Sequence, residues 1–461
     1  MLFSSIEFVV FFIIYFAFHF FLISSRRTYL IIFGSLIFYS YWQPFNVFVP
    51  IILSLLAWSG GLWIEKTPVI VNQKKRTVIL IFSLLLPLIF FKYSAFIFIS
   101  ILNIDSELMN FPSEIPIGIS FITFTAIAYV IEVYKGKFTA ESKFKDVLQY
   151  VLFFPQLIAG PILRPSELMD QLKFPKPASQ GLFILGIVFF IIGLVKKIFF
   201  ADQIGIFIDP IWENPLYASN EQILSAFYGF AIQIYLDFSG YTDMAIGLAL
   251  ILGVKLPSNF NSPYLSSDIS EFWRRWHITL SNWLRDYVYI PLGGNRAGSI
   301  NQKRNLLLTM VVGGIWHGAG WNFLIWGAFH GLLLAITNYV RKTIKLKFFP
   351  KILGIFITFH LVCIGWIFFR ASSLDVSLLF INRLLDIVSR PLSLHYSNFE
   401  MSVLVLIFVP LFLHYFDKRR FVEAIPDYIP NVVIIPISLV LFIACLILSY
   451  TYNAAFIYFD F

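Results

Sequence analysis

The sequence predicts an all-α, polytopic membrane protein with about 11 to 13 membrane helices, some of them re-entrant. Of the 461 residues, 59% are hydrophobic and only 13% are charged, whereas a soluble domain carries about 25% charged residues. The mean hydropathy is +0.80. Lys and Arg residues gather in short clusters between long apolar runs, as they do in membrane chains. The net charge of +8 therefore indicates membrane orientation, and we expect no nucleic-acid partner.

Thirteen apolar segments are candidates for membrane helices, which need roughly 20 residues to cross a bilayer. They lie at about residues 6–24, 29–42, 45–64, 78–102, 115–134, 146–160, 181–206, 222–253, 304–318, 320–340, 352–369, 401–417 and 431–450. Several are too short for a simple crossing, notably 29–42, 146–160 and 304–318, so we expect re-entrant elements among them. The first segment has no charged region before it and no cleavage site after it, which indicates a retained span. We expect a single membrane domain over residues 1–461.

The charges between the segments predict the topology. The loop with Asp105, Glu107 and Glu114 has no Lys or Arg and is expected on the outside, as is the N-terminus. Basic loops expected in the cytoplasm lie at 26–27, 74–76, 135–145, 255–304, 341–351 and 418–420. Between about residues 160 and 206 the rule gives no consistent answer. The basic residues there cannot all be cytoplasmic with straight crossings: Arg164, Lys173, Lys176, Lys196 and Lys197.

Two polar features interrupt the apolar segments. Pro155, Gly160-Pro161 and Pro165 predict either a bent, re-entrant element or an ordinary loop. Asp237 and Asp243 lie inside an apolar run and must face the protein interior or a water-filled cavity. They are six residues apart, on opposite sides of a helix, which favours structural hydrogen bonding over a paired acid and base.

The stretch 268–289 concentrates aromatic and basic residues. Helical spacing places Phe272, Trp276 and Trp283 on one face. The adjacent face carries Arg274, His277, Ser281 and Arg285, next to Arg275. This pattern predicts an amphipathic helix whose basic face binds an anionic group such as a phosphate. The alternative is an interfacial helix whose arginines bind membrane-lipid headgroups. The following Gly-rich loop, 292–296, is too generic to be assigned as a phosphate site.

Two histidines are candidates for chemistry: His277 in Trp-Arg-Arg-Trp-His and His317 in Gly-Gly-Ile-Trp-His-Gly. An ionisable side chain at membrane depth is a functional hypothesis by default. Four of the remaining histidines are interpreted as structural: His19, His360, His395 and His414. His330 is expected either to be structural or to support the residues of the site. Cys363 and Cys445 lie in apolar runs, so neither a disulfide nor a cysteine metal site is predicted.

The runs FWRRWHITLSNWLRDYVYIPLGGNR and NLLLTMVVGGIWHGAGWNFLIWGAFHG closely resemble the membrane-bound O-acyltransferase superfamily, MBOAT, in its branch containing the alginate O-acetyltransferase membrane subunit. Further matches are MLFSSIEFVVFF, PIGISFITF, FPQLIAGPILRP, YLDFSGYTDMAIGLALILG and a closing FIYFDF. The resemblance implies tilted helices around a thinned central funnel. It also implies that His317 is the catalytic histidine and that His277 matches the second family position.

The residues make acyl transfer chemically sensible. His317 is suited to take a proton from an acceptor hydroxyl as that oxygen attacks a thioester, with His277 orienting or sharing the proton. The expected substrate-binding residues are Arg274, Arg275, Ser281, Arg285, Trp316 and Asn322. Gly313, Gly314 and Gly318 are expected to let substrate approach closely. We expect acetyl-CoA as the acyl donor and no metal.

The resemblance implies a bacterial inner-membrane enzyme that acetylates an extracytoplasmic polysaccharide, such as an alginate-like exopolysaccharide or peptidoglycan. We expect a periplasmic or surface acetyltransferase of esterase-like type as partner. Two alternatives stay open: a D-alanyl transferase of the teichoic-acid type, and a non-enzymatic glycan or lipid transporter with proton-relaying His and Asp residues. A transporter should show repeated halves and a long basic groove, and the sequence shows neither.

Overall fold

A computed structural model describes residues 1–104, 111–112, 114–296, 298–343, 350–389, 398–451 and 456–457. The regular elements of the described residues are all helices, so the predicted all-α class is confirmed. Three features of the sequence analysis lie wholly or partly outside the described residues. They are the loop with Asp105 and Glu107, the residue His395, and most of the closing motif FIYFDF.

Six helices of the described residues are long and apolar enough to cross a membrane. They are Phe45–Glu65, Ile70–Tyr93, Gln180–Glu213, Trp321–Arg341, Lys351–Arg370 and Asn431–Tyr450. Shorter apolar helices lie at Ile6–Phe21, Ile119–Tyr134 and Ser402–Leu413. The chain is therefore a polytopic membrane protein, as predicted. The count of 11 to 13 crossings and the central funnel stay predictions.

The chain divides into two compact units, which are described separately. Unit 1 comprises residues 1–191, 241–257 and 426–446, and unit 2 comprises residues 192–240, 258–425 and 447–461. Four helices have residues in both units: α9 (Gln180–Val195), α11 (Asn220–Ile251), α19 (Arg419–Tyr428) and α20 (Asn431–Thr451).

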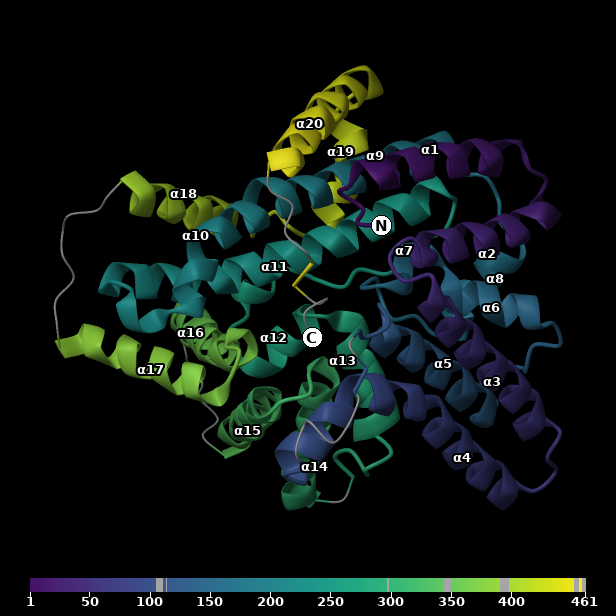
Figure 1. The fold of residues 1–461 in the computed structure, drawn as a ribbon, viewed down its shortest axis with the longest axis horizontal. Helices are drawn as coiled ribbons and strands as arrows, with labels where there is room; N and C mark the ends of the chain where they lie inside the picture. Colours follow the sequence, from purple (N-terminus) through teal and green to yellow (C-terminus); the bar gives the residue numbers. More distant parts are fainter. Residues whose placement is uncertain are drawn as a thin grey trace. The chain divides into compact units, whose positions relative to one another are not determined.

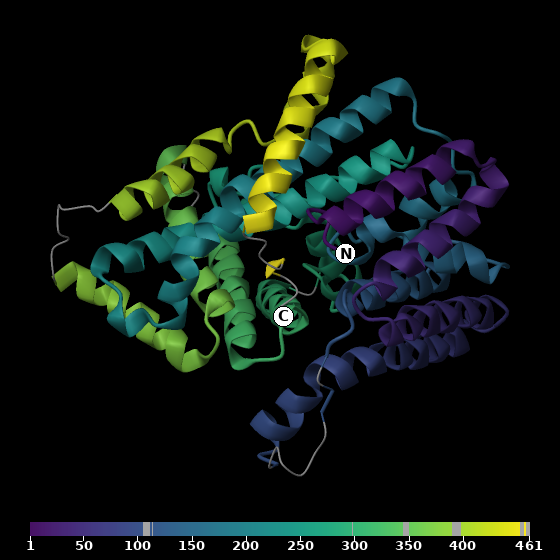
Figure 2. The same ribbon diagram turned by 45° about the horizontal axis from the view of Figure 1, so that its top comes forward.

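Unit 1 holds the N-terminal helices. They are α1 (Ile6–Phe21), α2 (Ser24–Ser40), α3 (Phe48–Glu65), α4 (Ile70–Leu88), α5 (Ile119–Tyr134), α6 (Phe144–Leu152), α7 (Phe154–Leu157) and α8 (Pro165–Lys173). α3, α4 and α5 pack against one another, and both ribbon views show them side by side (Figures 1 and 2). α5 is buried along nearly its whole length.

Of the two alternatives for the stretch around Pro155, a bent element and an ordinary loop, the structure has the bent element. The segment predicted at 146–160 is divided into α6 and α7, of nine and four residues, and nine helical residues extend only about 14 Å. The Tyr150 hydroxyl donates to the Leu163 carbonyl at 2.7 Å, and the Gln156 amide donates to the Tyr150 carbonyl at 2.7 Å. These bonds hold a buried, bent segment that is too short to cross a bilayer as one helix.

Unit 2 holds the helices that carry the candidate site. They are α10 (Asp202–Glu213), α12 (Ile269–Arg275), α13 (Ile278–Leu284), α14 (Gly298–His317), α15 (Trp321–Thr343), α16 (Lys351–Arg370), α17 (Leu374–Ser389) and α18 (Asn398–Leu413). α15 packs against both α14 and α16, and α16 packs on α17. α14 is not among the candidate spans, since its first half is polar and its apolar part is short.

Glycines bring α14 and α15 into close contact. A Cβ atom on Gly314 would lie 2.2 Å from the Phe323 carbonyl oxygen, and one on Gly327 would lie 2.4 Å from the Met310 carbonyl oxygen. A Cβ atom on Gly318 would lie 2.0 Å from the Phe323 ring. Gly314 and Gly318 therefore serve helix packing, and the expectation that they leave space for a substrate was wrong for these two residues.

Candidate active site

The chain breaks its helix at His277. α12 ends at Arg275, Trp276 is extended, and His277 has φ 41° and ψ 56°, in the left-handed region that non-glycine residues seldom adopt. α13 starts at Ile278, and a π-helical turn follows from Arg285 to Tyr289. The single amphipathic helix predicted over 268–289 is therefore wrong. The break turns Trp276 and His277 inward, where both are buried.

His277 is held on one side by an amide and packed by aromatic rings. Its Nδ1 lies 3.2 Å from the Oδ1 atom of Asn259. The Phe238 ring centroid lies 4.7 Å from the imidazole, edge to face, and the Trp316 centroid lies 6.1 Å away. The imidazole is 0% exposed, and this burial lowers the pKa of His277 to about 3. His277 is therefore neutral at physiological pH.

His317 is the last residue of α14. It packs among aromatic rings that include Trp316, which also lies near His277, and this group of rings is called the aromatic layer. Its ring centroid lies 4.9 Å from that of Trp316, 5.0 Å from that of Trp326 and 5.1 Å from that of Phe369. The side chain is 4% exposed. Trp316 thus contacts both His277 and His317. The structure brings the two predicted histidines and Trp316 into one layer.

The aromatic layer has buried hydrogen-bonding groups that pair with none of the described residues. The indole nitrogens of Trp273, Trp326 and Trp366 and both ring nitrogens of His330 have no hydrogen-bond partner among the described residues. His330 is fully buried, with its ring centroid 5.0 Å from that of Trp326. Buried polar groups normally have a partner. This layer therefore has hydrogen-bonding capacity available for a bound molecule or for water.

A cavity of about 540 Å³ opens beside this layer. Three of the predicted binding residues line it: Arg274, Ser281 and Arg285. Its other lining residues are Ser270, Trp273, Ile278, Asn282, Leu284, Tyr289, Leu306, Thr309, Met310, Leu334, Asn338 and Arg341. Trp273 connects the cavity to the layer, because its ring lies against that of Trp326. Neither His277 nor His317 lines the cavity itself, so the cavity offers three guanidinium groups near the layer that holds the two histidines.

The arginines of the cavity differ in their pairing. Arg285 pairs with Asp286 at 2.7 Å, and Arg341 pairs with Asp268. A hydrogen bond to Asp286 raises the pKa of Arg285 above its usual value, so it is charged at every accessible pH. Arg274 is exposed and forms no ion pair with the part of the chain that the structure describes. Arg274 is therefore the cation with most of its charge available to a ligand.

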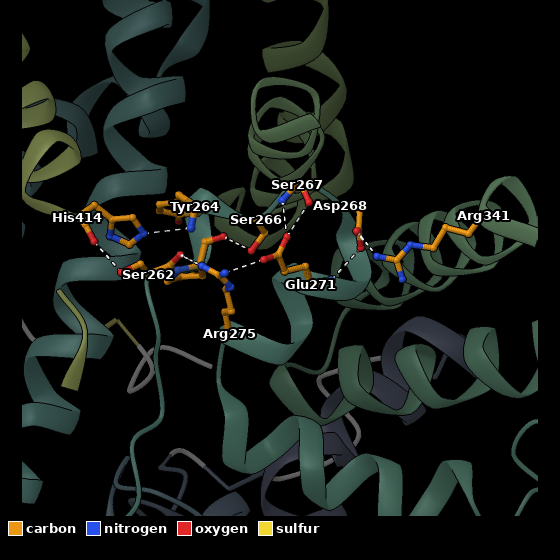
Figure 3. A network of polar contacts seen from close by, with 10 residues as sticks. Ser262, Tyr264, Ser266, Ser267, Asp268, Glu271, Arg275, Arg341 and His414 are labelled. Carbon is orange, nitrogen blue, oxygen red and sulfur yellow. Dashed lines mark hydrogen bonds and ion pairs between the residues drawn. The ribbon is translucent and has the colours of Figure 1, made fainter. Parts of the chain in front are cut away.

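Arg275 belongs to a different network, shown in Figure 3. Its guanidinium pairs with Glu271 at 2.6 Å and donates to the Ser262 carbonyl at 3.4 Å. Burial opposes ionisation of Glu271, but hydrogen bonds from Ser267 and the charge of Arg275 outweigh it and lower the pKa of Glu271. Arg275 therefore fastens the 259–268 loop to α12, and it does not line the cavity.

Asn322 also makes a structural contact. Its side-chain amide donates to the Ala371 carbonyl at 2.8 Å, which joins the start of α15 to the end of α16. Its Oδ1 atom has no hydrogen-bond partner among the described residues. Within the described residues, no group of three or more His, Cys, Asp or Glu side chains is placed to hold a metal ion.

Several residues around the site were not predicted from the sequence. Each of Asn259, Arg341, Asn338 and Phe369 lies between 18 and 52 residues from the nearer of the two histidines. Asn259 in Pro-Ser-Asn-Phe carries no signal of its own, since asparagine is common in loops. Arg341 was assigned only as a loop charge. Only the folded chain brings these side chains to the site.

Comparison with known proteins shows the family of this chain. The family model described as "MBOAT, membrane-bound O-acyltransferase family" matches residues 137–375. The chain belongs to this family and is an O-acyltransferase, so the non-enzymatic transporter alternative is set aside.

Three relatives indicate the range of substrates in the family. A probable alginate O-acetylase AlgI of Azotobacter vinelandii is 39% identical over 390 residues, which cover 82% of this chain and 76% of that protein. A peptidoglycan O-acetyltransferase of Helicobacter pylori is 38% identical over 76% of this chain and 72% of that protein. A teichoic acid D-alanyltransferase of Bacillus subtilis is 33% identical over 56% of this chain and 69% of that protein.

Proposed function

We propose that this protein transfers an acetyl group from acetyl-CoA to a hydroxyl for the O-acetylation of an extracytoplasmic polysaccharide. The observation that carries the proposal is the cavity lined by Arg274, Arg285 and Arg341 beside the layer of His277 and His317. Guanidinium groups bind phosphates in bidentate fashion, and coenzyme A carries phosphates. A donor held by these arginines extends its thioester toward the histidines.

His317 acts as the general base. It takes the proton of the acceptor hydroxyl while the hydroxyl oxygen forms a bond to the thioester carbonyl carbon. The carbon–sulfur bond then breaks, and the proton passes from the imidazolium to the departing thiolate, so the products are an acetyl ester and free coenzyme A. His277 orients or shares this proton across the layer that contains Trp316.

The donor enters from the cytoplasm and the acetyl group leaves on the other face of the bacterial inner membrane. The basic stretch 255–304 supports a cytoplasmic cavity, because Lys and Arg concentrate in cytoplasmic loops. A separate periplasmic or surface transferase of esterase-like type then collects the acetyl group and places it on the polysaccharide. The acetylating relatives support this class of acceptor.

Sealed vesicles of known orientation test this direction of transfer. Labelled acetyl-CoA is supplied on one side at a time, with the acceptor on either side, and the His317→Ala protein serves as the control. We expect labelled ester when the donor is on the cytoplasmic side and the acceptor on the other. Product that forms only when both are on the extracytoplasmic side would overturn the proposal.

A second candidate function is D-alanyl transfer, favoured by the 33% identity to the teichoic acid D-alanyltransferase. It is the weaker candidate, because that match covers 56% of this chain whereas the acetylating relatives cover 76% and 82%. Co-purification distinguishes them. A D-alanyl transferase should retain an acyl-carrier protein, whereas the acetyl transferase should retain an esterase-like transferase.

A further inference from the structure

One buried asparagine organises the backbone around His277. Asn259 is 1% exposed. Its Oδ1 atom lies 3.2 Å from His277 Nδ1, accepts from the Thr279 backbone N–H at 3.1 Å and accepts from the Thr279 hydroxyl at 3.0 Å. Its backbone carbonyl accepts from the Ile278 N–H at 2.9 Å. All of these contacts lie at the break between α12 and α13.

The contacts determine which atom of the amide faces His277. A backbone N–H can only donate, so the atom that receives the Thr279 N–H must be the amide oxygen and not the amide nitrogen. The same oxygen faces His277 Nδ1, which must therefore carry a proton to form a hydrogen bond. In the neutral imidazole, the other nitrogen, Nε2, is then the proton acceptor.

We propose that Asn259 is a positioning residue that holds His277 as the Nδ1–H tautomer, so that Nε2 is the nitrogen that exchanges protons during acyl transfer. The inference rests on the proposed function, in which His277 shares the proton taken by His317. The left-handed backbone at His277 supports it, because a non-glycine residue keeps such a conformation only where the surroundings enforce it.

Aromatic rings and two further titratable groups also surround His277. Phe238 from α11 and Trp316 from α14 pack against the ring and carry no charge. His317 and His330 are titratable groups of the same aromatic layer. The Nδ2 group of Asn259 has no hydrogen-bond partner among the described residues. Replacement of that group by oxygen therefore removes no hydrogen bond, and Asn259→Asp is a matched variant.

Three variants separate positioning from a purely structural role. Asn259→Ala removes the acceptor of His277, Thr279→Val removes one donor to the same oxygen, and Asn259→Asp keeps the acceptor and adds a negative charge. We expect Asn259→Ala to lower kcat at least about tenfold, with little change in the KM for acetyl-CoA, because a wrong tautomer cannot serve in proton transfer. Thr279→Val should stay within about twofold of wild type.

The pH profile of kcat in Asn259→Asp adds a further test, because a purely structural role of Asn259 would leave that profile unchanged. A carboxylate beside Nδ1 favours the protonated imidazole, so the acidic limb of the kcat profile should move to higher pH by about one unit or more. Activity should then recover as the pH rises. If Asn259→Ala fails to fold, Asn259→Asp still tests the positioning role. An unchanged pH profile of Asn259→Asp with native kcat overturns the proposal.

A direct readout is ¹⁵N NMR of protein labelled at histidine, with the His277 signal identified by its loss in His277→Gln. We expect an Nδ1–H tautomer in wild type and a mixture in Asn259→Ala. An Nε2–H tautomer in wild type, or equal losses of kcat in Asn259→Ala and Thr279→Val, overturns the proposal. If the tautomer is as expected but His277→Ala keeps full activity, the role given to His277 under the proposed function fails instead.

Discussion

The Lys196 ammonium lies 2.6 Å from the Asp417 carboxylate, although the two residues are 221 positions apart. Lys196 follows α9 and Asp417 follows α18, and Asp417 also accepts a hydrogen bond from the Tyr235 hydroxyl. The adjacent Lys197 pairs with Asp202 at 2.8 Å and with Asp237 at 2.7 Å. Both lysines are thus ion-paired inside unit 2.

These pairs account for two of the five basic residues that gave no consistent topology between about residues 160 and 206. The rule counts Lys and Arg residues in loops, whereas Lys196 and Lys197 lie within the candidate span Gln180–Glu213. Asp237, expected to have a structural role, holds Lys197 and accepts the Ile457 N–H at 2.8 Å.

We predict that Lys197→Met destabilises the protein strongly. Lys197 is 4% exposed, and Asp202 and Asp237 are each 1% exposed. Removal of the cation leaves two buried carboxylates close together, at a cost of about 3 to 5 kcal/mol. Thermal unfolding in detergent measures the effect. The control is Arg419→Ala, which breaks a more exposed pair with Glu423 and should cost less than about 1 kcal/mol.

The sequence predicted the class of fold because hydropathy, a local signal, marks the apolar helices. The roles of the two histidines stay predictions, which rest on the Trp-His-Gly motif for His317. The break at His277 was not predictable from spacing. It depends on hydrogen bonds that the Asn259 side chain, 18 residues earlier, accepts from His277 and Thr279, and these bonds override the helical periodicity of Arg274, Ser281 and Arg285. Those three residues still reach one cavity, but Arg275 is held by Glu271.

Gly314→Leu should prevent α14 and α15 from packing. The new side chain would meet the Phe323 carbonyl oxygen, because even a Cβ atom there lies 2.2 Å away, and backbone cannot move aside as a flexible side chain can. We expect loss of folded protein in size-exclusion chromatography. Gly181→Ala is the matched control, since a Cβ atom at Gly181 meets nothing within 4 Å. A monodisperse, stable Gly314→Leu protein would contradict this account of the helix pair.

The histidines should differ in their effect on activity. His317→Ala should abolish acyl transfer while the protein stays folded in the membrane, because no other side chain replaces the proposed base. His277→Ala should lower kcat severely, by about 100-fold or more. His360→Ala is the control, since His360 is bonded to Phe356 and Tyr228 and does not belong to the layer. Turnover at the wild-type rate in His317→Ala would remove the assignment of the base.

Stability should depend on pH through His414. Burial lowers the pKa of His414 from its usual 6.5 to about 4, and its Nε2 accepts the Tyr264 N–H at 3.1 Å, which requires a neutral ring. At pH values between about 4, the pKa in the folded protein, and 6.5, the ordinary pKa, the unfolded chain binds more protons than the folded one. The contribution to stability is therefore complete above pH 6.5 and is lost as the pH falls toward 4.

The comparison of wild type with His414→Gln isolates this contribution, because glutamine accepts the same hydrogen bond at any pH. The difference in Tm between the two proteins should change sign or shrink as the pH falls from 7 to 4. His277, whose pKa is also lowered by burial, titrates in both proteins and cancels. Parallel Tm curves for the two proteins would show that His414 does not titrate on unfolding.

The two neighbouring arginines, Arg274 and Arg275, should act on different properties. Arg274 lines the cavity without an ion pair to any described residue, so its guanidinium is available to a donor phosphate. Arg275 is occupied by Glu271 and the Ser262 carbonyl. Loss of one charge-assisted hydrogen bond costs about 1.5 kcal/mol or more, which corresponds to a donor interaction weaker by at least about tenfold. We therefore expect Arg274→Ala to raise the KM for acetyl-CoA by about that factor and to leave Tm unchanged.

Arg275→Ala should lower Tm and leave the KM for acetyl-CoA within about twofold, because its contacts fasten the 259–268 loop and not the donor. Initial rates over a range of acetyl-CoA concentrations, with thermal unfolding of the same preparations, measure both effects. Equal increases in KM for the two variants would show that Arg275 also contacts the donor and that the cavity extends to it.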